Sequence, residues 1–225
     1  MATRIVAAAL LAVLGFTGGA SADKGHVHHL HMEKTVFFPA QKPSIASGKV
    51  VYEKFCAACH GDSGRGDGPA AAALTPKPTS FADSLFNHSV HEMTHSHLFD
   101  SVTHGVPPMP AFGMVLTEAQ RWDATAYVWA LSTTPDRLRD GQEVYRKFCA
   151  GCHGARGGGD GPAGKGIRRM PDFTDLKWMS GVEDARFFKG ISRGLHGPVA
   201  SWGGQLSEQE RWNVVDYIRS LTHSE

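Results

Sequence analysis

Hydrophobic side chains recur at helical spacing ahead of each of two cysteine pairs in this chain. Val51 and Phe55 share one helix face before the first pair, and Val144 and Phe148 share one before the second. Residues four apart lie on the same face of an α-helix. The pattern therefore predicts a helix in front of each cysteine pair.

Further helices are predicted after each pair. The segments LTEAQRW (116–122) and LSEQERW (206–212) each contain a capping box, in which side chains satisfy free N–H groups at a helix start. Middle helices are expected at about 91–103 and 183–193, and long Gly- and Pro-rich loops, such as residues 61–78, lie between the helices. So little regular structure would bury only a small core, which a large flat apolar cofactor would complete.

The chain contains an internal repeat. GKVVYEKFCAACHGDSGRGDGPA (48–70) aligns without a gap with GQEVYRKFCAGCHGARGGGDGPA (141–163), and LTEAQRW aligns with LSEQERW. Such self-similarity indicates two copies of one fold. We therefore predict a first domain over 47–133 and a second over 134–225, joined by a linker at 133–140.

The start of the chain is typical of a secretory signal peptide. Arg4 is its lone charge, an apolar run follows over 5–16, and small residues precede Asp23. We predict a signal peptide over 1–22 and an irregular, His-rich lead-in over 23–46. No later stretch is long and apolar enough for a membrane span, so the mature chain is expected to be soluble and periplasmic, with no span.

Charge and cysteine placement narrow the class of protein. The 23 Lys and Arg residues nearly balance the 22 Asp and Glu residues, which gives no indication of nucleic-acid binding. An exported chain with four cysteines would ordinarily suggest disulfides. Here, however, all four cysteines fall in two CxxC pairs, and a histidine follows each pair directly.

The CxxCH motif occurs twice and predicts covalent haem. Its members are Cys56, Cys59 and His60 in the first half and Cys149, Cys152 and His153 in the second. Two thiols at this spacing can add to the two vinyl groups of one porphyrin, and the imidazole that follows can bind the iron. A zinc half-site or a thioredoxin-like pair would not require histidine at the same place twice. The sequence predicts two haem c groups.

These motifs resemble class I c-type cytochromes. The resemblance includes the CAACHG and CAGCHG motifs, the GDGPA loops, the segments PKPTSFAD, RMPDFTD and GVPPMPAF, and both capping boxes. The chain from 47 to 222 is similar to dihaem modules associated with bacterial iron permeases and with respiratory chains. The resemblance implies an all-α protein of two tandem cytochrome c-like domains, each with a few helices and long loops wrapped around one covalent haem. It also implies periplasmic electron transfer.

The sixth iron ligand differs between the halves. Met109 lies in GVPPMPAF, where the family has its distal methionine, and a thioether suits ferrous iron. Counting back from LSEQERW, the equivalent position in the second half is Val199, which cannot bind iron. His196 in the same loop is the favoured candidate. Met170, Met179 and an open iron are the alternatives.

Two histidine clusters raise the question of a further metal site. They are His26, His28, His29 and His31 in the lead-in, and His88, His91, His95, His97 and His104 in the first half. Imidazole binds several transition metals. A solvated polar surface is nevertheless favoured, because no cysteine or carboxylate joins these histidines at a recognisable ligand spacing.

Electron transfer is the function that these features favour, and no enzymatic activity is predicted. The expected partners are other redox proteins: a membrane-bound reductase or oxidase, or small electron carriers. Two alternatives stay open. One is a haem enzyme, a peroxidase or small-molecule reductase, that uses an open or weakly ligated second haem. The other is a redox module that handles iron or copper through the His-rich segments.

Overall fold

The protein is described from a computed structural model that covers residues 35–82, 93–168, 170–194 and 201–224. These residues belong to one compact unit, Thr35–Glu225. The predicted signal peptide and most of the predicted lead-in lie outside the described residues. Other residues singled out in the sequence also lie outside them: His26, His28, His29, His31, His88, His91, His196 and Val199.

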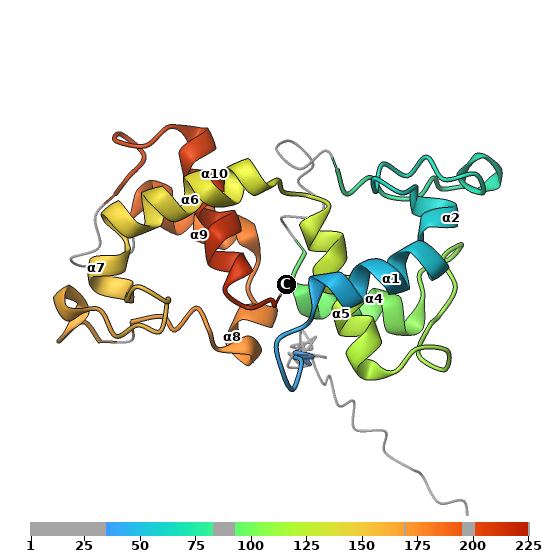
Figure 1. Ribbon diagram of the computed structural model, residues 1–225, viewed down its shortest axis with the longest axis horizontal. Helices are drawn as coiled ribbons and strands as arrows, with labels where there is room; N and C mark the ends of the chain where they lie inside the picture. The colour runs from blue at the N-terminus through green and yellow to red at the C-terminus, as the bar shows by residue number, and fades with distance from the viewer. Residues whose placement is uncertain (1–34, 83–92, 169, 195–200, 225) are drawn as a thin grey trace, which may run out of the picture. The chain divides into compact units, whose positions relative to one another are not determined.

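Both halves of the chain are helical (Figure 1). The first half contains α1 (Ile45–Phe55), α2 (Ala57–His60), η1 (Ala71–Ala73), α4 (His95–His104) and α5 (Glu118–Ala130). The second contains α6 (Pro135–Phe148), α7 (Ala150–His153), η2 (Pro162–Gly164), α8 (Leu176–Ser180), α9 (Asp184–Arg193) and α10 (Glu208–Ser220). The described residues form no strand, which confirms the all-α prediction. None of their helices is long and apolar enough to cross a membrane.

In each half, one glycine allows two helices to pack closely against each other. Helix α1 packs on α5 in the first half, and α6 packs on α10 in the second (Figure 1). A Cβ at Gly48 would collide with the carbonyl oxygen of Asp123, and a Cβ at Gly141 with that of Asn213. Glycine at these two equivalent positions therefore lets the helix backbones approach closely.

The predicted capping boxes are both present. The Thr117 side chain accepts from the backbone N–H of Gln120, and the Gln120 side chain accepts from the N–H of Thr117. Ser207 and Glu210 make the same reciprocal pair at the start of α10. These contacts confirm the helix starts, because each box needs only residues within one turn.

The predicted linker at 133–140 is wrong, since α6 begins at Pro135. The Thr134 side chain caps this helix by accepting from the N–H of Arg137, and proline fits the first helical position because its missing N–H would have no partner there. The middle helix of the first half also begins later than expected. It starts at His95, where Thr94 supplies the cap, and not at 91.

Aromatic packing follows the internal repeat closely. The tilted pair Tyr52–Tyr127 has its counterpart in Tyr145–Tyr217. The remaining equivalent pairs are Phe99–Trp122 with Phe188–Trp212, Phe55–Phe112 with Phe148–Trp202, and His60–Phe81 with His153–Phe173. The two halves can therefore be compared position by position.

Backbone hydrogen bonds join Ser224 to the segment before α1. Ser224 donates its N–H to the carbonyl of Pro43 at 2.9 Å, and Ile45 donates its N–H to the carbonyl of Ser224 at 3.0 Å. These bonds hold residues 222–224 of the second half beside the segment that leads into α1.

Candidate haem-attachment sites

Each CxxCH motif lies at a junction between two helices. Cys56 ends α1, with its N–H donating to the carbonyl of Tyr52, and also begins the short helix α2. His60 donates its N–H to the carbonyl of Cys56 at 2.9 Å, so the motif forms a single helical turn. Cys149 and α7 repeat this arrangement in the second half. The backbone thus brings both thiols and the imidazole of each motif within one turn.

The four cysteines are free and partly buried thiols. Burial raises the pKa of Cys56 to about 11 and that of Cys149 to about 12, and the second thiol of each pair adds to the shift. Redox-active CxxC pairs and zinc sites instead need an accessible thiolate. Among the described residues, no group of three or more His, Cys, Asp or Glu side chains could hold a metal ion. The zinc and thioredoxin-like alternatives therefore find no support here.

The first imidazole is held by a backbone carbonyl on one side. His60 Nδ1 lies 3.3 Å from the carbonyl oxygen of Thr79. Burial lowers the pKa of His60, and the Thr79 carbonyl opposes this shift. A neutral imidazole that gives its Nδ1 proton to a carbonyl keeps Nε2 free as a metal ligand.

The second imidazole has a matching environment. Burial lowers the pKa of His153, and the carbonyl of Pro171 opposes the shift in the same way. Nδ1 of His153 is buried, but the Pro171 carbonyl does not meet the geometry of a full hydrogen bond to it. Both histidines are therefore neutral, with one ring nitrogen facing the loop that follows the motif.

A phenylalanine stacks on each of these histidines. Phe81 lies on His60 with ring centroids 4.7 Å apart and planes at 22°, and Phe173 lies on His153 at 4.7 Å and 23°. Neither phenylalanine was predicted as a site residue from the sequence. Their positions in the aligned segments TSFAD and PDFTD were the available signal. Each ring restricts the orientation of the imidazole that it covers.

The glycine-rich loops place these phenylalanines. Gly64 has a φ of 72°, and its carbonyl oxygen accepts a hydrogen bond from the N–H of Phe81 at 2.6 Å. Gly157 has a φ of 82° and accepts the N–H of Phe173 at 2.7 Å. Residues with a side chain rarely adopt this left-handed backbone. The loops thus connect each CxxCH turn to the ring that covers its histidine.

Met109 lies in a tight turn after α4. Its N–H donates to the carbonyl of Val106 at 2.7 Å, and its side chain is partly buried. Phe112 then donates to the carbonyl of Val102 at 3.0 Å and packs edge-on against Phe55, next to Cys56. The turn is thereby anchored to α4 behind it and to the cysteine-bearing helix beside it.

The corresponding loop of the second half is anchored in the same way. Trp202 takes the place of Phe112, donates to the carbonyl of Ile191 at 3.0 Å and packs on Phe148. Between the equivalent helix ends and aromatic anchors this loop is one residue longer. The counterpart of Met109 is therefore Pro198 when counted from α9 and Val199 when counted from Trp202. Neither side chain can bind iron.

Met170 and Met179 belong to the region that follows His153. Met170 lies beside Gly159 and Gly164, in the loop that leads to Pro171. Met179 is buried in the core cluster of the second half together with Phe173. This placement does not favour either methionine as the sixth ligand, and His196 lies outside the described residues.

One of the histidines expected on the surface is buried. His97 and His104 are exposed, as expected. The surface prediction is wrong for His95, which is only 8% exposed, because its ring stacks on that of His223 near the end of the chain. Helix α4 begins at His95, and His91 lies outside the described residues.

Comparison with known families agrees with this duplicated architecture. Residues 43–128 match the family model described as cytochrome c oxidase, cbb3-type, subunit III, and residues 138–222 match the family model of cytochrome c. The chain is therefore a c-type cytochrome built from two tandem cytochrome c-type domains, which confirms the predicted class and fold.

The chain is similar to several known proteins over most of its length. Over 211 residues the chain is 28% identical to the cbb3-type cytochrome c oxidase subunit FixPc of Rhizobium leguminosarum bv. viciae, covering 90% of this chain and 71% of that protein. It is 30% identical to FixP of Bradyrhizobium diazoefficiens, over 78% of this chain and 60% of that protein. A chain of the reducing HAO-like protein complex of Kuenenia stuttgartiensis is 28% identical, with a TM-score of 0.36, covering 84% of this chain and all of that one.

Two cytochrome c-type domains imply two covalently bound haem c groups, and the residues present fit them. Each motif offers two free thiols and a neutral imidazole whose Nδ1 faces a carbonyl. The first cysteine of each motif packs in a hydrophobic cluster: that of Cys56 includes Phe81 and Val128, and that of Cys149 includes Phe148 and Phe173.

Proposed function

We propose that the chain is a periplasmic electron relay that links a redox donor to an acceptor through its two haem domains. The observation that carries this proposal is the equivalent geometry of the two CxxCH turns within one compact unit. When bound, a haem supplies a one-electron iron couple. The protein supplies attachment, axial ligands and exclusion of water.

In the first domain we propose that Cys56 and Cys59 hold the porphyrin and that His60 and Met109 bind the iron. The Thr79 carbonyl and the Phe81 ring fix the imidazole of His60. A thioether ligand raises the reduction potential of the iron.

In the second domain we propose that Cys149 and Cys152 hold the porphyrin, that His153 binds the iron, and that His196 is the sixth ligand. The loop has no methionine at the position equivalent to Met109. A His–His pair gives a lower potential than a His–Met pair. Electrons would then enter at the second domain and leave from the first.

The relatives named as cbb3-type oxidase subunits support a respiratory partner. We propose that the chain exchanges electrons with a membrane-bound oxidase or reductase, or with a small electron carrier. The near balance of 23 basic and 22 acidic residues does not by itself select a partner of either charge.

A redox titration of the matured protein with separate variants of the two domains tests the proposal. Wild-type protein should titrate as two one-electron steps. Met109→Ala should lower only the higher potential, and His196→Ala should change only the lower one. A single shared step, or a Met109→Ala titration identical to wild type, would refute the assignment of ligands.

A haem enzyme is the second candidate, and one observation favours it. The position equivalent to Met109 falls on Pro198 or Val199, so the second iron has no methionine ligand in this loop. An iron without a strong sixth ligand can bind small molecules. Addition of cyanide to the ferric protein separates the two functions: an unchanged spectrum supports the relay, and a change assigned to the second domain supports the enzyme.

A further inference from the structure

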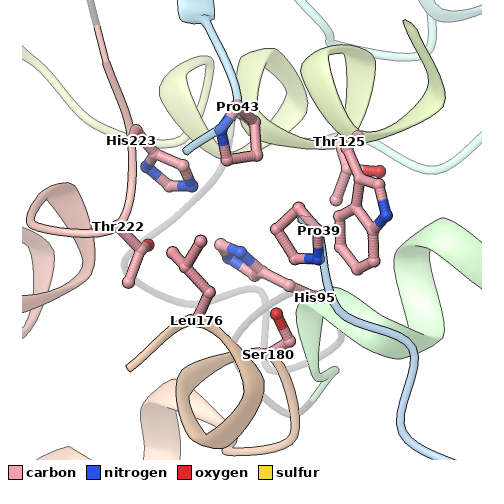
Figure 2. A pocket seen from close by; sticks show the side chains of 10 residues that line it. Pro39, Pro43, His95, Thr125, Leu176, Ser180, Thr222 and His223 are labelled. Carbon is pink, nitrogen blue, oxygen red and sulfur yellow. The ribbon is translucent and has the colours of Figure 1, made fainter. Parts of the chain in front are cut away.

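Beyond the haem sites, the two halves meet at a buried joint. We use the name interdomain joint for His95 and Trp129 of the first half and Asp184, Arg219 and His223 of the second. Figure 2 shows His95 and His223 among the side chains that line the pocket where these elements meet. Pro39, Pro43, Thr125, Leu176, Ser180 and Thr222 complete the labelled lining of this pocket (Figure 2).

Aromatic stacking joins the halves here. The rings of His95 and His223 have centroids 5.4 Å apart and planes at 17°, and the ring centroid of Trp129 lies 4.6 Å from that of His223. His223 Nδ1 is buried and makes no hydrogen bond. Both imidazoles are thus embedded among rings, with little polar contact.

A fully buried arginine lies beside these rings. Arg219 has no exposed surface, donates through Nε to the Asp184 carboxylate at 2.8 Å, and donates to the carbonyls of Met179 at 2.6 Å and Val182 at 2.8 Å. Asp184 is only 4% exposed. The one carboxylate at the joint is therefore already paired with a cation.

The internal repeat explains why the joint has this composition. His95 and Asp184 are the first residues of α4 and α9, and Trp129 and Arg219 are the penultimate residues of α5 and α10. Where the second half has the ion pair of Asp184 with Arg219, the first half therefore has two neutral side chains, His95 and Trp129. A proton on His95 would place a second cation near Arg219.

We propose that the interdomain joint is a pH-sensitive contact, closed while His95 and His223 are neutral and opened when they take up protons. The groups that face them are few. Arg219 and Asp184 face both histidines, Lys42 of the lead-in faces His223, and each histidine faces the other. Within the described part of the chain, these two cations and the paired carboxylate offer no partner to an added positive charge.

The electrostatics of the joint agree with its geometry. Burial lowers the pKa of His95 well below its ordinary value and that of His223 to about 3, Arg219 lowers both further, and Asp184 opposes the shift. Because these values are depressed, the joint is at full strength above the free histidine pKa of about 6.5 and weakens as the pH falls below it. The pocket has a volume of ≈ 10 Å³, enough for about one water and not for the hydration shell of an imidazolium.

The consequence for the relay rests on the proposed function. Electrons pass between the domains more slowly as the two haem sites move apart. An opened joint would leave each domain folded but would slow electron transfer between the domains. Acid would therefore lower the rate of electron transfer without unfolding the protein.

Small-angle scattering of the full-length haem-loaded chain between pH 7.5 and 4.5 tests the proposal. Wild-type protein should expand as the pH falls, while the spectrum of each haem stays native. The His95→Gln, His223→Gln double variant removes both titrating rings, and its expansion should be absent or moved to lower pH by about one unit or more. The control His97→Gln, an exposed histidine on the same helix, should expand as wild type does.

Wild-type protein that stays compact at pH 4.5, or a glutamine double variant that expands with the wild-type midpoint, would overturn the proposal. If glutamine loosens the joint at pH 7.5, the His95→Phe, His223→Phe variant keeps two stacked rings without a titrating nitrogen and gives the same comparison. Scattering does not depend on electron transfer. The joint can therefore be tested even if the redox titration refutes the relay.

Discussion

Replacing Arg219 with leucine is expected to destabilise the second domain by about 3–5 kcal/mol. The guanidinium has no exposed surface and is paired with Asp184, which is 4% exposed. It also satisfies the carbonyls of Met179 and Val182. The substitution would remove the guanidinium that these three groups share, and this loss exceeds what the added apolar contact of leucine returns.

Urea unfolding of the haem-loaded protein, followed by far-ultraviolet circular dichroism, measures this effect. The matched control is Arg139→Leu, because Arg139 also pairs with carboxylates, Asp136 at 2.7 Å and Asp140 at 3.1 Å, but is 60% exposed. Exposed pairs contribute about 0–1 kcal/mol, so the control should unfold close to wild type. An Arg219→Leu loss below about 1 kcal/mol would refute the reasoning that buried charge dominates here.

Three further predictions concern single residues. Met109→Ala should lower one of the two reduction potentials and leave the other unchanged, as redox titration would reveal, because only the first domain has a methionine in this turn. Gly141→Ala should cost about 1–3 kcal/mol in urea unfolding because its Cβ would collide with Asn213, whereas Gly151→Ala, with nothing within 4 Å, should not destabilise. Ser207→Ala should cost about 1 kcal/mol because it removes the cap of α10, and a lower urea midpoint would show this loss. Ser201→Ala, at an exposed serine, is the control.

The parts of the fold that depend on neighbours in sequence could be predicted from the sequence. The capping boxes at Thr117 and Ser207 are local, and both helices begin where the boxes placed them. Pro135 was misread as part of a linker, because proline both breaks helices and occupies their first turn, and only the Thr134 cap distinguishes the two. The short helix α8 was not predicted, because five residues show too little periodicity to be recognised.

Features that depend on distant residues could not be predicted in this way. His95 is buried because its ring stacks on His223, more than a hundred residues further along the chain. Its sequence neighbours therefore suggested a solvated surface, which was wrong. The stacking of Phe81 and Phe173 on the motif histidines likewise depends on loop geometry set by glycines with positive φ. For the proposed haem sites, the sequence supplies the candidate residues but not the way in which their neighbours orient them.

Mass spectrometry of peptides from the matured protein tests the central claim most directly. One haem mass should be found on the peptide that contains Cys56 and Cys59, and one on the peptide that contains Cys149 and Cys152. Both should stay attached through acid–acetone extraction, because thioether bonds survive it. Unmodified peptide masses at either pair, or release of the pigment into acetone, would contradict the account.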